Sequence, residues 1–185
     1  MRLFIAVSIG EENKNKIFDI QSVLKRSCVD VKWIEKDNLH LTLKFLGEVA
    51  EDNLDSVKES IRRAVAEFKR FQINLESIGV FPNEKSPRVL WMGINKGEVE
   101  LKNISQNLEG SLEELGFKKE TREFSAHLTI GRFRSNSEKE KLFKIIEKFQ
   151  NENIIESVNA VYLIKSTLSP KGPAYGVIEE YQLGL

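Results

Sequence analysis

The chain of 185 residues has 28 basic and 28 acidic side chains and is 41% hydrophobic, which is typical of a folded globular protein. Its zero formal net charge argues against a broad, non-specific nucleic-acid binder, because such proteins neutralise many phosphates with lysine and arginine. The single cysteine, Cys28, excludes a disulfide within the chain. We expect it to be a small buried hydrophobe in a protein of the reducing cytoplasm.

The composition also argues against a metalloprotein and a membrane protein. Two histidines and one cysteine, without ligand-spaced clustering, predict no metal site, and we expect no cofactor. The apolar run at residues 3–9 is too short to cross a membrane, and it lacks the small-residue cleavage site of a signal peptide before Glu11. We therefore expect a buried first strand and no membrane partner.

The periodicity of the apolar residues predicts strands and helices that alternate along the chain. In chain order, the expected elements are a strand at 3–9, a helix at 11–24, an extended stretch at 29–34, a strand at 39–46, a helix at 51–69, strands at 71–80 and 88–94, a helix at 98–115, a strand at 126–133, a helix at 137–149, and strands at 154–164 and 176–183. Residues 81–87 and 166–175 contain the proline and glycine typical of loops.

One tripeptide occurs twice and holds both histidines of the chain. His40-Leu41-Thr42 and His127-Leu128-Thr129 start 87 residues apart (127 − 40) and include two of the four threonines. Side chains alternate between the two faces of a strand, so each imidazole shares a face with its threonine hydroxyl. A preference for β-branched residues in strands would explain one copy, but it does not explain two copies that hold every histidine. The doubled motif therefore indicates a functional site.

The order of the elements repeats along with the motif. A strand, a helix, a motif strand, a helix and a strand follow one another from residue 3, and again from Arg88. Such a period indicates a duplicated α+β unit. We expect a single domain over residues 1–185, built of two lobes related by a pseudo-twofold axis, each an antiparallel sheet with helices on its outside. The motif faces, near 40–43 and 127–130, would then meet across a central cleft.

Two imidazoles across a cleft form an acid–base pair. Because histidine titrates at about pH 6.5, one ring can take a proton from a nucleophile while the other gives one to a leaving oxygen. The hydroxyls of Thr42 and Thr129 can donate to non-bridging oxygens of a developing anion. The phosphorus of a diester fits this set of groups. The residues alone leave open whether His40 or His127 is the acid.

These residues resemble the two-histidine (2H) phosphoesterase superfamily, whose signature is a paired His-x-Thr-x motif. The flanking residues narrow the resemblance to its RNA 2′,3′-cyclic phosphodiesterase branch, also called 2′-5′ RNA ligase; they lie at Trp33, 38–48, 87–91, 124–132 and 166–175. The resemblance runs from Arg2 to about Tyr181. The chain departs from the family at Ala126, where proline is common, but this change removes no chemical group.

The resemblance implies metal-independent hydrolysis of a 2′,3′-cyclic phosphate on RNA, tRNA fragments included, to a 2′-phosphate. It implies that His40 is the proton donor to the departing 3′-oxygen, that His127 is the proton acceptor that activates water, and that Thr42 and Thr129 hold phosphate oxygens. The reverse type of reaction would join such an end to a 5′-hydroxyl through a 2′-5′ linkage. We expect a monomer.

Two alternatives remain open on the sequence. The same chemistry could act on small cyclic nucleotides, an ADP-ribose cyclic phosphate or 2′-5′ oligonucleotides. In the other alternative the chain is a catalytically idle module that binds RNA ends. The two intact acid–base groups argue against an idle binder, which has no use for them.

Several residues near the motifs are weaker candidates. Strict alternation places Arg132 on the face opposite His127, so a structural salt bridge and a phosphate contact both fit it. Tyr175 is a candidate to line the cleft, where it would bind substrate by stacking on a base. We expect Trp91 to belong to the core rather than to a base-stacking platform. Lys44 is expected to be solvated, and with other basic residues near the motifs it could steer an anionic end into the cleft.

Overall fold

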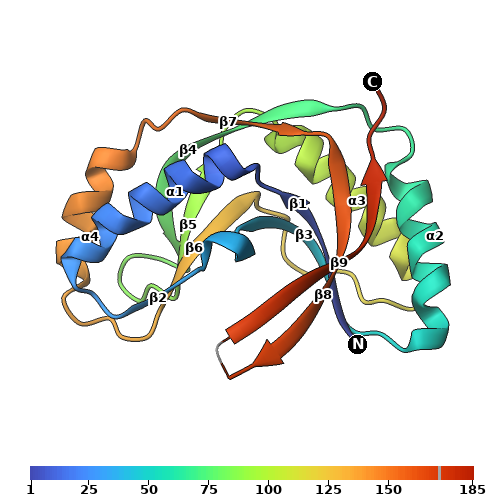
Figure 1. The fold of residues 1–185 in the computed structure, drawn as a ribbon, viewed down its shortest axis with the longest axis horizontal. Helices are drawn as coiled ribbons and strands as arrows, with labels where there is room; N and C mark the ends of the chain where they lie inside the picture. Colours follow the sequence, from blue (N-terminus) through green and yellow to red (C-terminus); the bar gives the residue numbers. More distant parts are fainter. Residues whose placement is uncertain (171) are drawn as a thin grey trace.

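Two antiparallel sheets carry the strands of the computed structural model, which describes residues 1–170 and 172–185 (Figure 1). The four-stranded sheet has the order β3 (His40–Glu48), β1 (Arg2–Ser8), β8 (Ala160–Ser169), β9 (Gly172–Gln182). The five-stranded sheet has the order β2 (Val31–Trp33), β6 (His127–Phe133), β5 (Val89–Ile94), β4 (Phe71–Phe81), β7 (Ile154–Val158). The expected α+β architecture of two antiparallel sheets is confirmed.

The helices lie on the outside of the sheets, two to each sheet (Figure 1). They are α1 (Glu11–Leu24) and α4 (Lys139–Ile146) on the five-stranded sheet, and α2 (Leu54–Val65) and α3 (Glu98–Glu113) on the four-stranded sheet. Short 3₁₀ turns cover Lys25–Ser27, Lys36–Asn38, Glu51–Asn53 and Glu147–Phe149. Among the described helices, none is long and apolar enough to span a membrane.

The two halves of the sequence interlock instead of forming one sheet each. Strand β1 belongs to the four-stranded sheet, but the helix α1 that follows it packs on the five-stranded sheet. Conversely, β5 belongs to the five-stranded sheet, but α3 packs against β3 in the other sheet. Strand β4 of the first half and strands β8 and β9 of the second half also cross to the opposite sheet. Each sheet therefore depends on both halves of the chain.

The core fills the space between the sheets and their helices. The leucines of the two motifs, Leu41 and Leu128, are buried, while the histidines and threonines beside them are only half-buried. This alternation confirms that each motif presents its imidazole and hydroxyl on one face and is anchored by apolar side chains on the other. We call the face of each sheet that bears its histidine and threonine the motif face.

The C-terminal part of the chain differs from the expected pattern. The expected strand at 154–164 is two strands, because the chain passes from one sheet to the other at Asn159. The expected loop at 166–175 is wrong: β8 continues to Ser169 and β9 begins at Gly172, while Lys171 lies outside the described residues. Proline is tolerated at Pro173 because β9 is an edge strand, where a missing N–H leaves no ladder bond unmade.

Two smaller expectations are also wrong. The helix expected at 51–69 ends at Val65, since Lys69 and the N–H of Arg70 pair with Gly184 near the C-terminus. Cys28 is exposed rather than buried, because it follows the turn Lys25–Ser27 with a left-handed backbone (φ 57°).

Candidate active site

The two motifs come together where the sheets meet. Cα atoms of β3 lie within 8 Å of Cα atoms of β6, although the two strands belong to different sheets (Figure 1). Within its own sheet each motif strand pairs with a neighbour, so that His40 lies opposite Ser8 and His127 lies opposite Gly93. The fold therefore places both imidazoles at the same junction.

Both histidines are anchored in the same way. Nδ1 of His40 donates to the carbonyl oxygen of Asn38, and Nδ1 of His127 donates to that of Ser125, each at 2.7 Å. A carbonyl oxygen only accepts, so Nδ1 carries the hydrogen of the neutral ring and Nε2 is left to exchange protons. Nε2 of His40 lies 3.1 Å from the hydroxyl oxygen of Thr42. Sequence reasoning could not find these anchors, because any residue type supplies a backbone carbonyl.

A bulge follows the tripeptide in each motif strand. Leu43 in β3 and Ile130 in β6 each stand as an extra residue without a partner in the neighbouring strand. The carbonyl of each extra residue accepts a hydrogen bond from a helix on the same sheet: Gln21 of α1 donates Nε2 to Ile130 at 2.8 Å, and Ser105 of α3 donates Oγ to Leu43 at 3.1 Å. Ser105 thus supplies a donor to the carbonyl of Leu43, and Gln21 adds a second donor to that of Ile130, which also accepts from the N–H of Ile34 at 3.1 Å.

The bulge in β6 places the side chain of Arg132 on the same face as His127, and not on the opposite face as expected. Strict alternation would place this side chain opposite His127, but the extra residue Ile130 shifts the alternation by one position. Ile130 and Gly131 are both buried, and Arg132 is exposed on the motif face. Within residues 1–170 and 172–185, Arg132 forms no ion pair, so the salt bridge, one of the two roles that fitted Arg132 on the sequence, is not made.

The electrostatics of the site favour the neutral form of both imidazoles. Burial lowers the pKa of His40 and of His127, and the positive charge of Arg132 lowers both further, while the hydrogen bonds to Asn38 and Ser125 act in the opposite direction. One guanidinium therefore acts on both rings. A bound anion would compensate the charge of Arg132 and favour protonation of a neighbouring imidazole.

Aromatic rings flank His40. The ring of Phe4 lies 4.8 Å from the imidazole, and that of Tyr175 lies 5.2 Å away in an edge-on arrangement. Asn38 donates Nδ2 to the carbonyl of Pro173 at 3.1 Å, which ties the approach to the first motif to the strand that carries Tyr175. Tyr175 therefore lies beside His40, as expected for a residue that lines the site.

Aromatic rings also flank His127, and here the expectation for Trp91 is wrong. Trp91 pairs with Thr129, so its side chain points to the motif face, and it is half-buried outside the hydrophobic core. Phe81, expected to lie in a loop, ends β4; its ring lies 4.9 Å from the indole and 5.1 Å from the imidazole of His127. Sequence reasoning missed Phe81 because Pro82 and the polar residues after it are typical of a loop.

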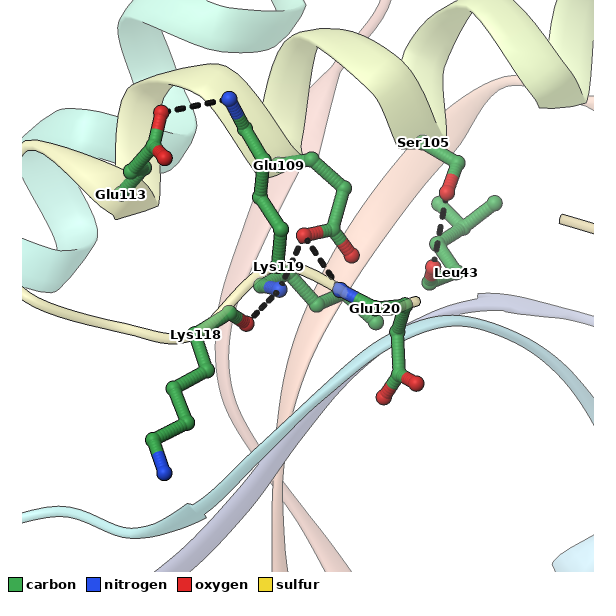
Figure 2. A network of polar contacts seen from close by, with 8 residues as sticks. Leu43, Ser105, Glu109, Glu113, Lys118, Lys119 and Glu120 are labelled. Atoms are coloured by element: carbon green, nitrogen blue, oxygen red, sulfur yellow. Dashed lines mark hydrogen bonds and ion pairs between the residues drawn. The ribbon is translucent and has the colours of Figure 1, made fainter. Parts of the chain in front are cut away.

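A buried ion pair joins the first motif strand to the segment that leads into the second (Figure 2). Lys44, expected to be solvated, has a side chain that is 1% exposed, and its Nζ lies 2.6 Å from Oε2 of Glu109 on α3. The same Nζ donates to the carbonyl of Lys118 at 3.1 Å, and the N–H of Glu120 donates to Glu109 at 3.3 Å. The pair therefore holds residues 118–120 against α3.

The described residues contain no candidate metal site. Among positions 1–170 and 172–185, no three His, Cys, Asp or Glu side chains are placed to hold a metal ion together.

The comparison with known proteins shows the family of the chain. The family model of LigT-like phosphoesterases matches residues 7–91 and 94–175, which include both motifs. The chain belongs to this family. It is 41% identical to an RNA 2′,3′-cyclic phosphodiesterase of Methanocaldococcus jannaschii, over 98% of this chain and all of the relative. It is 34% identical to a protein of the same name from Methanothermobacter thermautotrophicus, over 99% of both chains.

Solved structures of other proteins share the fold. The crystal structure of TT0787 of Thermus thermophilus is similar with a TM-score of 0.82 and 27% identity, and the similarity covers 99% of this chain and 98% of the other. The crystal structure of Escherichia coli LigT complexed with 3′-AMP has a TM-score of 0.79 at 22% identity, over 98% and 97% of the two chains. At that identity the second likeness shows the fold alone.

Proposed function

We propose that this protein hydrolyses the 2′,3′-cyclic phosphodiester ends of RNA, tRNA fragments among them, to 2′-phosphates without a metal or other cofactor. The observation that carries the proposal is the matched anchoring of His40 and His127, each fixed through Nδ1 to a backbone carbonyl, around one arginine, Arg132. The shared name of the curated relatives supports this class of substrate.

The chemistry follows from an in-line displacement at phosphorus. The attacking and leaving oxygens lie on opposite sides of the phosphorus, so the base and the acid must flank it. In the proposed order, taken from the family resemblance, Nε2 of His127 accepts a proton from water as the water oxygen bonds to phosphorus. Nε2 of His40 donates a proton to the 3′-oxygen as that bond breaks. The phosphate stays on the 2′-oxygen.

Three side chains stabilise the charge that develops on the phosphoryl oxygens. The hydroxyls of Thr42 and Thr129 share the motif faces with the imidazoles and donate to non-bridging oxygens. Arg132 contributes a full positive charge and several donors. Because the charge of Arg132 lowers the pKa of His40, a bound phosphate that compensates this charge raises that pKa again. The substrate thus promotes the protonated state that the acid needs.

Tyr175 marks the side of the site on which the terminal nucleoside lies. The 3′-oxygen that leaves belongs to the ribose, so the ribose lies next to the acid His40. Tyr175 is 5.2 Å from that imidazole and offers an aromatic edge to the ribose or base.

A product assay tests this proposal. A short RNA with a 2′,3′-cyclic phosphate is incubated with the protein in EDTA, and the position of the phosphate is read by its sensitivity to phosphatases and by mass. We expect a 2′-phosphate. Turnover of 2′,3′-cyclic AMP or an ADP-ribose cyclic phosphate, but not of the RNA, would assign the substrate to the small cyclic phosphates. Tight binding of the RNA without turnover would reduce the protein to a binding module.

We further propose that residues 1–185 act as one domain, as a monomer in the cytoplasm. The exchange of β4, α1 and α3 between the sheets supports one domain, since neither half contains a complete sheet with its helices. A single cooperative unfolding transition and a mass of one chain in solution are the expected results.

A further inference from the structure

We propose that Trp91 and Phe81 bind the base of a second nucleoside, the one whose 5′-oxygen enters or leaves at phosphorus on the His127 side. We call these two rings the aromatic shelf. The inference rests on the proposed function and adds to it an acceptor site, which fits RNA with a 5′-hydroxyl.

The aromatic shelf is built into the motif face of the five-stranded sheet. Trp91 lies across Gly79 of the neighbouring strand, where an added Cβ would come within 2.4 Å of Cζ2 and 2.5 Å of Cη2 of the indole. A Cβ at Gly93 would come within 3.1 Å of Cζ3 of the same ring. The glycines leave room for the indole to pack closely over the two strands, so the ring forms part of the surface of the motif face.

The packing of the shelf is unlike that of a core aromatic pair. Both rings are half-buried, and neither belongs to the hydrophobic clusters that fill the space between the sheets and the helices. Phe81 meets the His127 imidazole at an interplanar angle of 86°, so the shelf begins directly beside the base of the reaction. A nucleobase that stacks here would lie close to the nucleophile.

The position of the shelf separates it from the terminal nucleoside of the RNA end. That nucleoside occupies the His40 side, beside Tyr175 and Phe4, because its 3′-oxygen is the leaving group. The in-line rule places the incoming oxygen on the opposite side, beside His127. Water needs no aromatic surface, whereas a nucleoside that replaces water gains a stacking contact.

The joining reaction at this site needs no reactant besides the cyclic RNA end and the 5′-hydroxyl. In the joining direction the 5′-oxygen bonds to phosphorus and gives its proton to Nε2 of His127, while the bond to the 3′-oxygen breaks and that oxygen takes a proton from Nε2 of His40. The product is a 2′-5′ phosphodiester. In the reverse direction the 3′-hydroxyl attacks and gives its proton to His40, and the 5′-oxygen leaves with a proton from His127.

The test measures cleavage of two dinucleotides in the reverse direction. One is adenylyl-2′-5′-adenosine, and the other has the same linkage but lacks the base on its 5′-linked ribose. For the unaltered protein we expect kcat/KM to be roughly 10-fold to 100-fold lower for the abasic compound, since one base stack is lost. Trp91→Leu should reduce this ratio to about 3 or less, while Trp91→Phe should retain most of it.

The matched control is Trp33→Leu. Trp33 lies in the same sheet and packs against the core, so its loss should leave the ratio between the two dinucleotides unchanged. Each variant is also assayed for hydrolysis of an RNA 2′,3′-cyclic end. This assay shows that the variant is folded and retains the proposed function, independently of the dinucleotides. Trp91→Leu should lose at least 10-fold more activity on adenylyl-2′-5′-adenosine than on the cyclic end.

Other results would overturn the acceptor site. They are equal cleavage of the two dinucleotides by the unaltered protein, no cleavage of either while the cyclic end is hydrolysed, or an unchanged ratio in Trp91→Leu. A protein that cleaves neither dinucleotide and leaves the cyclic end intact would refute the proposed function itself.

Discussion

Gln21 donates a hydrogen bond from Nε2 to the carbonyl oxygen of Ile130, at 2.8 Å. Gln21 is fully buried on α1, and Ile130 is the extra residue that turns Arg132 toward the histidines. A helix of the first half therefore supports the conformation of the second motif. This contact connects the interlocked fold to the orientation of the charge in the site.

Replacing Gln21 with methionine should weaken both the fold and the site. The variant leaves the carbonyl of Ile34 without the amide donor and removes one of two donors from the carbonyl of Ile130, which keeps the N–H of Ile34. An unsatisfied buried group costs about 1–3 kcal/mol. We expect a lower free energy of unfolding in urea and a lower kcat/KM. Gln150→Met is the control, since Gln150 also donates to two carbonyls, but those of Ile78 in β4 and Ile146 in α4 instead of a motif strand. Equal losses of activity in the two variants would contradict the role of Gln21.

Arg132 should set the pH dependence of the free enzyme. Burial lowers the pKa of both histidines, and the Arg132 charge lowers both further, so the limbs of the kcat/KM profile should lie on the acidic side of about 6.5. In Arg132→Met the protonated rings lose a repulsive neighbour, so both pKa values rise and both limbs move to higher pH. Arg132→Lys keeps the charge and should keep the position of the limbs. A profile that stays in place in Arg132→Met would show that the guanidinium does not act on the rings.

The threonine hydroxyls should contribute to the rate and not to the fold. Valine keeps the β-branched shape and removes the donor, so Thr42→Val and Thr129→Val should each lower kcat roughly 10²-fold to 10³-fold. Serine keeps the hydroxyl, so Thr42→Ser and Thr129→Ser should retain most of the activity. Steady-state kinetics on an RNA cyclic end checks both series. Valine variants as active as the serine variants would remove the hydroxyls from the mechanism.

The ion pair of Lys44 and Glu109 should matter chiefly for stability. Lys44→Met leaves a mostly buried carboxylate without its partner, which typically costs about 3–5 kcal/mol, whereas Lys44→Met combined with Glu109→Met should recover much of that loss. Lys102→Met, in an exposed pair with Glu123, should lower the free energy of unfolding much less, because solvent screens the pair. Urea unfolding measures all three. A loss in Lys44→Met no larger than in Lys102→Met would contradict the structural role of this pair.

The repeat in the sequence was sufficient to predict the two-sheet architecture and the candidate histidines. The period of the motif and the alternation around His40 and His127 are local properties, so they can be read from the residues. The same alternation predicted that Thr42 and Thr129 share a face with the histidines, which the burial pattern of the two strands shows.

The remaining features depend on contacts between distant parts of the chain. The bulge at Ile130 is stabilised by Gln21, which lies 109 residues away, so the orientation of Arg132 could not be inferred from β6 alone. Trp91 alternates with the buried Leu90 and Met92 in β5, and it is Gly79 on the neighbouring strand that makes room for its ring over the sheet. The hairpin that carries Tyr175 was expected as a loop, because the edge position that tolerates Pro173 is a property of the sheet.

Turnover of an RNA 2′,3′-cyclic end by His40→Asn and His127→Asn tests the two-histidine account most directly. Asparagine keeps a polar side chain on the motif face but cannot exchange protons near neutral pH. We expect each variant to lose roughly 10²-fold to 10⁴-fold in kcat, and the double variant to lose far less than the product of the two, since the rings act as a pair. The unaltered protein should yield a 2′-phosphate in EDTA. Turnover at the unaltered rate by either single variant would contradict the account.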